Sequence, residues 1–200
     1  MKKLETLLKD YADHVADRAA KGIPPLPLNA EQTSCVTHLL EQKNNYKSEY
    51  LLDLLINRVP PGVDEAAYVK ASWLTAIVNG EKHCEFIDPK KAIEILGTMI
   101  GGYNVNSLIE ILKSKNNELA KEAAQVLKNI ILVYDAANDI FDLSQSNIYA
   151  KEVVNSWANA EWFMNKKVLQ KEITCLVFKV DGETNTDDLS PAVHLSLIHI

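Results

Sequence analysis

The chain has 200 residues, of which 47% are hydrophobic and 24% are charged, so it can bury the core of an ordinary globular domain. Seven glycines and seven prolines are too few for a disordered or fibrous chain. The net charge of −6 argues against a nucleic-acid or anionic-membrane surface, which would require a local excess of lysine and arginine. No stretch approaches the roughly 20 uninterrupted apolar residues of a membrane span, and acidic residues interrupt the N-terminal segment, so we expect a cytoplasmic protein.

The first segment is predicted to be an amphipathic helix that ends at Gly22. Its apolar residues recur at steps of three and four, which places them on one helix face. These residues are Leu4, Leu7, Leu8, Tyr11, Val15 and Ala19. Several prolines follow Gly22, which is typical of a helix stop. Asn29 is a plausible N-cap for a second helix that reaches Leu40.

Turn residues divide the next part of the chain into further short helices. A third helix is predicted over 50–57 and is broken by Pro60, Pro61 and Gly62. Asp64 and Glu65 place negatively charged carboxylates at the N-terminus of a fourth helix, where the helix dipole is positive. This helix is predicted to reach about Val78.

Similar signals continue as far as residue 165. Asp88 and Pro89 open a fifth helix through Leu96, and another helix follows over 108–112. Asn116 or Asn117 caps the next helix, and a last one carries apolar residues at near four-residue spacing. The apolar residues of that last helix are Tyr149, Val153, Trp157 and Ala160. Short amphipathic helices in series predict a mainly α fold, a HEAT-like helical domain (α-solenoid) over 1–165, although no clean repeat period is present.

The character of the sequence changes after residue 166. Residues 173–180 are β-branched and aromatic on both alternating faces, which predicts a strand covered on two sides. A single strand is not stable without the other strands of its sheet. We therefore interpret 166–192 as the start of a second, truncated domain, of which this segment is the first strand.

Isolated chemical groups give no catalytic pattern. Cys35, Cys84 and Cys175 are widely spaced and in no paired arrangement, so we interpret them as partly buried thiols and expect no metal site. Trp157, Trp162 and Phe163 could form an aromatic binding surface, but at helical spacing such residues more often pack in a core or between domains.

Four stretches of the sequence resemble the aconitate hydratase B family, in the right order and across almost the whole chain. Long matches of unusual composition are far more specific than a short motif. The stretches are 51–71, with Asn-Arg-Val-Pro-Pro-Gly at its centre, Gly97–Asn104, Ser156–Phe163 and Val177–Ala192.

The resemblance implies the N-terminal part of an aconitate hydratase of the tricarboxylic acid cycle, which converts citrate to isocitrate through cis-aconitate. Dehydration of 2-methylisocitrate is implied as a second activity. In this family the helical domain precedes a swivel domain, and an iron–sulfur cluster held by cysteines much later in the chain acts as a Lewis acid. We therefore expect this chain alone to bind no cofactor and to be inactive, with no catalytic residue of its own.

One loop of the resemblance borders the substrate pocket in other aconitases. Carried over to this sequence, Thr186, Asp187 and Ser190 would contribute hydrogen bonds near the pocket. Most aconitases have a histidine at the position of Asp188, whereas the aconitate hydratase B subfamily replaces that histidine, as this sequence does. The alternative interpretation is a polar turn after a strand, where such residues are common.

The resemblance ends after Ala192. Residues 193–200 are predicted to be a non-native tail, because the last six are similar to a translated transposase adaptor used in sequencing libraries. The partners implied are the remaining domains of the same enzyme and a small tricarboxylate, with a homodimer through the helical domain left open. A stand-alone helical scaffold that binds proteins is the alternative function. The acidic balance argues against RNA binding.

Overall fold

The structure is a computed structural model that describes residues 2–42, 47–100, 102–165, 171–175 and 182, with the side chains of the first helix described from residue 6 onward. The described residues form helices joined by short connections. They are α1 (Lys2–Ala20), α2 (Ala30–Leu40), α3 (Ser48–Asn57), α4 (Glu65–Val78), α5 (Pro89–Leu96), α6 (Tyr103–Leu112), α7 (Asn117–Leu127), α8 (Ala136–Leu143), α9 (Ile148–Ala158) and α10 (Glu161–Met164).

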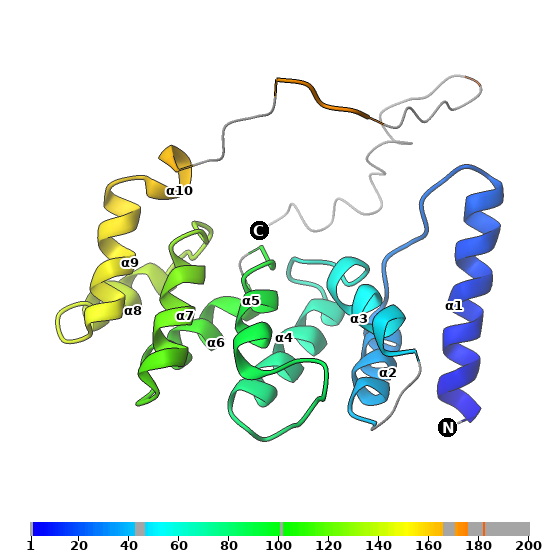
Figure 1. Ribbon diagram of the computed structural model, residues 1–200, viewed down its shortest axis with the longest axis horizontal. Helices are drawn as coiled ribbons and strands as arrows, with labels where there is room; N and C mark the ends of the chain where they lie inside the picture. The colour runs from blue at the N-terminus through cyan, green and yellow to red at the C-terminus, as the bar shows by residue number, and fades with distance from the viewer. Residues whose placement is uncertain (1, 43–46, 101, 166–170, 176–181, 183–200) are drawn as a thin grey trace.

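The helices pack side by side into an elongated body, which confirms the mainly α prediction (Figure 1). One row is formed by α2, α4, α6 and α8, each of which contacts the next member of the row. On the other side, α5, α7 and α9 contact one another in the same way. Consecutive helices also pack as pairs, for example α4 with α5 and α6 with α7. None of the described helices is both long and apolar enough to cross a bilayer.

Side-chain caps start several helices where the sequence predicts them. Asn29 and Asp88 accept hydrogen bonds from backbone amides in the first turns of α2 and α5. Asp64, which the sequence predicts only as an acidic residue at the start of this helix, also caps α4 through the amide of Ala67. At α7 the cap is Asn116, which decides between the two asparagines that the sequence offers. These bonds satisfy amides that would otherwise have no partner at the helix start.

Three helix predictions need correction. The helix predicted over 108–112 begins earlier, at Tyr103, and α8 was not predicted. The last long helix ends at Ala158 and does not extend to Ala160, which has a left-handed backbone (φ 51°) and starts the short helix α10. A left-handed alanine cannot continue an α-helix.

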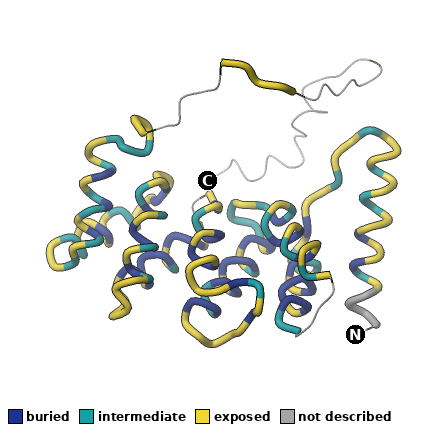
Figure 2. Tube along the Cα trace, viewed as in Figure 1, coloured by how far each residue is buried: buried dark blue, intermediate teal, exposed yellow. Residues whose placement is uncertain are grey.

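The core runs between the two rows as one continuous cluster of buried apolar side chains, visible as the dark blue inner faces in Figure 2. Every helix from α2 to α9 contributes to it. Members that are completely buried include Val36, Leu55, Leu74, Leu108, Leu127 and Val153. Within one row, α5 and α7 come very close, because a Cβ atom on Gly97 would lie 2.6 Å from Cγ1 of Val126. The packing of α5 against α7 therefore depends on a glycine at this position.

The predicted strand is only partly described. Residues 173–175 are exposed and belong to no strand, and 176–180 lie outside the described residues. Cys175 is exposed, so the expectation of a partly buried thiol is wrong at this position. Backbone that pairs with no neighbouring strand has nothing to hold it as a sheet, which accounts for the exposed conformation of 173–175.

Helix α1 packs on the body through Leu8 and Tyr11, which belong to the core cluster, and is also joined to it through the proline-rich segment 23–28. The Tyr11 hydroxyl donates to the Leu26 carbonyl at 2.9 Å. From the end of α3, Arg58 Nη2 donates to the Pro25 carbonyl at 2.6 Å and its Nε donates to the Tyr11 oxygen at 3.3 Å. Arg58 is thus the one side chain of this group that reaches α1, the proline-rich segment and the body together.

Replacing Arg58 by alanine should loosen α1. Hydrogen bonds to a charged group contribute about 1.5–3 kcal/mol each, so we expect the free energy of unfolding to fall by roughly 2 kcal/mol. Amide hydrogen exchange should become faster in α1 and in 23–28, while α6 and α7 keep their rates in native conditions.

Lys21→Ala is the matched control for this substitution. It removes an exposed ion pair with Asp17 on the same helix, and such pairs contribute little to stability. Unchanged exchange of α1 in Arg58→Ala would contradict the assigned role of the arginine.

Candidate functional site

The predicted pocket-loop residues Thr186, Asp187 and Ser190 lie outside the described residues, as does most of the stretch 177–192. The three earlier stretches that carry the resemblance are described, apart from Gly101. Their connections meet at one long edge of the body, which we call the upper edge (Figure 1). It consists of the connections that follow α3, α5, α7 and α9, that is 58–64, 97–100 with Gly102, 128–135 and 159–160.

Two neighbouring connections of the upper edge, those after α3 and α5, are bonded to each other. The amide of Ile100 donates to the Pro61 carbonyl at 2.9 Å, which joins the connection after α5 to the one after α3. Gly102 has φ +80°, and a Cβ atom there would lie 2.7 Å from Cγ1 of Val63. Only glycine combines this backbone with so close an approach. The two connections therefore hold a single arrangement.

Aromatic and amide groups support the same region. The rings of Tyr68 and Tyr103 meet edge to face with centroids 5.1 Å apart, although both residues remain exposed. Asn104 is fully buried and its Nδ2 donates to the carbonyls of Leu96 at 2.9 Å and Met99 at 3.3 Å. These bonds join the start of α6 to the end of α5 and to the connection that follows it.

The aromatic stretch at the end of α9 divides into a packing part and an exposed part. Trp157 packs against the core and its Nε1 donates to the Leu127 carbonyl at 3.0 Å, so the packing interpretation is confirmed for this residue. The Ser156 hydroxyl donates to Glu161 at 2.8 Å and joins α9 to α10. Phe163 is 56% exposed and its ring contacts that of Trp162.

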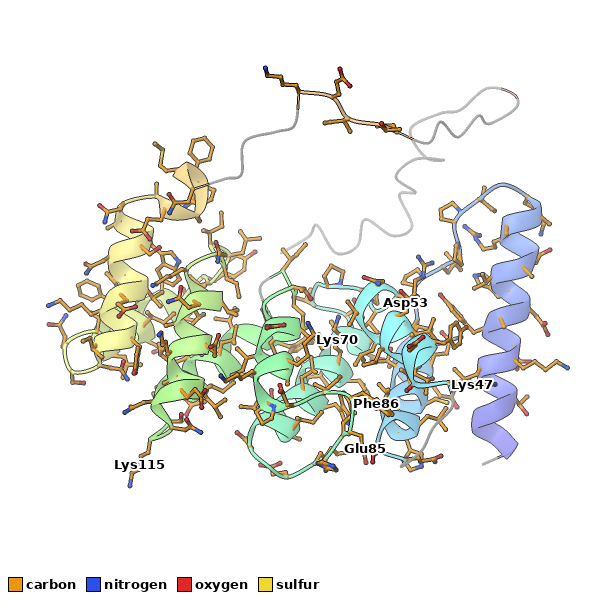
Figure 3. All side chains as sticks on the ribbon, in the orientation of Figure 1. Lys47, Asp53, Lys70, Glu85, Phe86 and Lys115 are labelled. Carbon is orange, nitrogen blue, oxygen red and sulfur yellow. The ribbon has the colours of Figure 1, made fainter. Side chains whose placement is uncertain are left out.

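Lys70 is the one lysine among the described residues whose side chain is in the core, with 2% of its surface exposed (Figure 3). Burial lowers the pKa of its amine to about 8, because the charged form loses its hydration. Its Nζ donates to the Ile56 carbonyl at 3.3 Å. This carbonyl lies in the last turn of α3, where the helix dipole favours a positive charge.

Glu41 forms a second polar cluster at the opposite edge of the body. Trp73 Nε1 donates to its carboxylate at 2.7 Å, and the ammonium of Lys82 binds the same oxygen. Partial burial alone would raise the pKa of Glu41, but the bonds from Lys82 and Trp73 outweigh it and lower the pKa. The cluster links α2 to α4 and its following connection, which is a structural role.

No group of three or more His, Cys, Asp or Glu side chains that could hold a metal ion occurs within the described ranges. Cys35 and Cys84 are buried in separate elements, and burial raises the pKa of both thiols. Thiols that stay protonated are poor metal ligands and poor nucleophiles. The described side chains therefore do not fit an iron–sulfur cluster.

Comparison with known proteins identifies the family to which the matched stretches belong. Residues 10–163 match the family model for the aconitate B N-terminal domain. The chain belongs to the aconitate hydratase B family. Aconitate hydratase B of Synechocystis sp. is 56% identical over 188 residues, which is 94% of this chain and 22% of the relative. The Escherichia coli and Pseudomonas aeruginosa enzymes are each 52% identical over 187 residues, 93% of this chain and 21% of either relative.

The chain thus spans about a fifth of the length of these aconitate hydratase B relatives. The resemblance found in the sequence is confirmed as membership of the family. Two features of the site were not predicted from the sequence, namely the buried amine of Lys70 and the grouping of the matched stretches at one edge. Lys70 lies in α4 among residues that are buried on much of the helix circumference, and a lone lysine in an apolar segment does not reveal from the sequence whether it points inward.

Lys70→Met should stabilise the protein near neutral pH. The folded pKa of about 8 is below the ordinary value of 10.5, so the unfolded chain binds more protons between these values and the stability of the wild type rises with pH there. Below about pH 8 the buried charge costs roughly 3 kcal/mol at 1.36 kcal/mol per pKa unit. We expect the variant to be about 1–3 kcal/mol more stable at neutral pH, since it also loses the bond to Ile56.

Urea denaturation between neutral pH and pH 10.5 measures this difference. The difference in the free energy of unfolding between Lys70→Met and the wild type should shrink steadily above pH 8. Lys91→Met, which changes an exposed lysine paired with Glu94, serves as the control and should leave the pH dependence unchanged. A gain for Lys70→Met that is the same at every pH would contradict the assignment.

Thiol accessibility provides a separate test of the packing. With a maleimide reagent in native buffer, Cys175 should react first, while Cys35 and Cys84 should react only as the helices open. In a Cys175→Ser variant the fast phase should be absent. Fast labelling of two or more thiols, located by peptide mass mapping, would show that the described core is not closed around α2 and the connection after α4.

Proposed function

We propose that this chain is the N-terminal part of an aconitate hydratase that interconverts citrate and isocitrate through cis-aconitate in the tricarboxylic acid cycle. Dehydration of 2-methylisocitrate is included as a second reaction. The observation that carries the proposal is the family match over 10–163, together with relatives about 50% identical across more than nine-tenths of the chain. The iron–sulfur cluster of the full-length enzyme would supply Lewis-acid chemistry from residues beyond this chain.

The proposal assigns a supporting role to the described helices. They would form a HEAT-like solenoid, supported by the contacts between next-but-one helices, namely α2 with α4, α4 with α6, α5 with α7, α6 with α8 and α7 with α9. Residues 166–192 would begin the swivel domain. Thr186, Asp187 and Ser190 would border the substrate pocket with hydroxyl and carboxylate groups. The solenoid would shape access to the active site and contact other parts of the enzyme or a second subunit.

A domain replacement tests this proposal. In the Synechocystis enzyme, the matched N-terminal domain is replaced by residues 10–163 of this chain. Turnover of cis-aconitate by this chimera is followed by its ultraviolet absorbance. We expect the chimera to keep activity within roughly tenfold of the parent, a change of about 1.4 kcal/mol in barrier. The 200-residue chain alone should show no turnover, since its described side chains include no cluster ligands.

Two results would count against the proposed function. One is turnover by the isolated chain. The other is a folded chimera that binds its cluster, as judged by visible absorbance, but is inactive. The same replacement with the core variant Leu74→Asp, which should unfold the helical domain, is the control for loss of activity through misfolding.

A further inference from the structure

The pair Asn79–Gly80 begins the connection 79–88 between α4 and α5, in which Figure 3 labels Glu85 and Phe86. Asn79 is the C-cap residue of α4 and is exposed. Gly80 is also exposed and has φ +75°. A Cβ atom on Gly80 would have no neighbour within 4 Å, so the pair is open to water. The sequence contains no other asparagine that is followed by glycine.

An asparagine that precedes a glycine can react with its own backbone. The glycine amide nitrogen gives up its proton and attacks the side-chain carbonyl carbon. A C–N bond forms, and the side-chain nitrogen leaves as ammonia, which carries that proton away. Water then opens the resulting five-membered succinimide ring at either carbonyl and leaves aspartate or isoaspartate. Water thus replaces ammonia without any oxidant, and glycine favours the attack because it has no Cβ atom to obstruct its nitrogen.

The structure holds the pair in a conformation that does not react. The amide of Gly80 donates to the Ile77 carbonyl at 3.0 Å, and the amide of Glu81 donates to the Ala76 carbonyl at 2.9 Å. These bonds form a Schellman cap at the end of α4. With ψ −6° at Asn79, the nitrogen of Gly80 is turned away from the asparagine side chain, whereas a five-membered ring requires the two to be nearly eclipsed.

Only this cap has to open for the reaction to proceed. Both residues of the pair lie beyond Val78, the last residue of α4, while the side chains of Ile77 and Val78 are buried. Exposed hydrogen bonds at a helix end open at a much lower free energy than those inside a packed helix. The rate at Asn79 should therefore follow the fraction of time for which the cap is open.

The product would weaken the same cap. It places a carboxylate at the C-terminal end of α4, where the helix dipole is already negative. Oε1 of Glu81, which lies 3.4 Å from Nδ2 of Asn79, would then face a second carboxylate. Isoaspartate also adds a carbon atom to the backbone, so the spacing that the Schellman bonds require is lost. The reaction is therefore expected to leave the end of α4 open.

We propose that Asn79–Gly80 is a modification site at which the chain converts its own asparagine to isoaspartate through a succinimide, and that the product loosens the connection after α4. This connection contains Lys82, which binds Glu41, and the buried thiol of Cys84. The isoaspartate would present a backbone carboxyl group of the kind that carboxyl-methylating enzymes take as a substrate. The site is separate from the proposed hydratase function, since its only reactant besides the chain is water.

Ageing of the 200-residue chain in warm, mildly alkaline buffer tests the site. Peptide mass mapping follows the replacement of an NH2 group by OH, and enzymatic methylation of the peptide identifies isoaspartate. Asn106–Ser107 is the internal control, because Asn106 is exposed but lies within α6. Each site is compared with itself in urea, so that the difference between serine and glycine cancels. We expect folding to slow the reaction at Asn106 at least about tenfold more than at Asn79.

Thiol labelling provides a second readout of the modified cap. In the aged wild type, Cys84 should react with maleimide faster than in fresh protein. Asn79→Gln is the matched control, because it keeps an exposed amide at the cap but would have to form a larger ring. Its Cys84 should keep the labelling rate of fresh protein after the same incubation.

Three results would overturn the modification site. The first is an unmodified Asn79 in the aged native chain over a time in which it reacts in urea. The second is a rate at Asn79 that is the same in native buffer and in urea, which would mean that the cap gives no protection. The third is labelling of Cys84 that rises equally in aged Asn79→Gln, because the connection would then loosen without isoaspartate.

Discussion

The structure depends on the burial of apolar side chains between two rows of helices that are too short to be stable alone. From α2 to α9 the helices have between 8 and 14 residues, and isolated helices shorter than about 12–15 residues are marginal in water. Each therefore persists because its neighbours in both rows cover its apolar face. The connections of the upper edge take their positions from this packing.

Helix starts were predicted well because capping is local chemistry. Asn29, Asp64 and Asp88 lie immediately before apolar periodic segments, and each bonds to the amides that a new helix leaves unpaired. Helix α8 gives no such signal, since Asp135 makes no side-chain cap bond and the preceding Tyr134 has a left-handed backbone. A helix stabilised mainly by its neighbours cannot be read from its own sequence.

The candidate site was predicted less completely than the fold. The matched stretches identified the family, which the comparisons confirm, because long similarities carry much more information than spacing. Nothing in the sequence indicated that these stretches would meet at one edge. The exposure of Ile100 and Leu132 and the burial of Lys70 depend on distant elements, and apolar connections read equally well as core. The predicted pocket loop around Asp187 remains a prediction.

The close approach of α5 and α7 has an evolutionary consequence. With Gly97 and Val126 in contact, the two positions share a fixed amount of space. A larger residue can arise at position 97 only if position 126 has first become smaller, and the reverse order would push α5 and α7 apart. Across related lineages the two sites should therefore change in a set sequence of steps, so the history of either residue records that of the other.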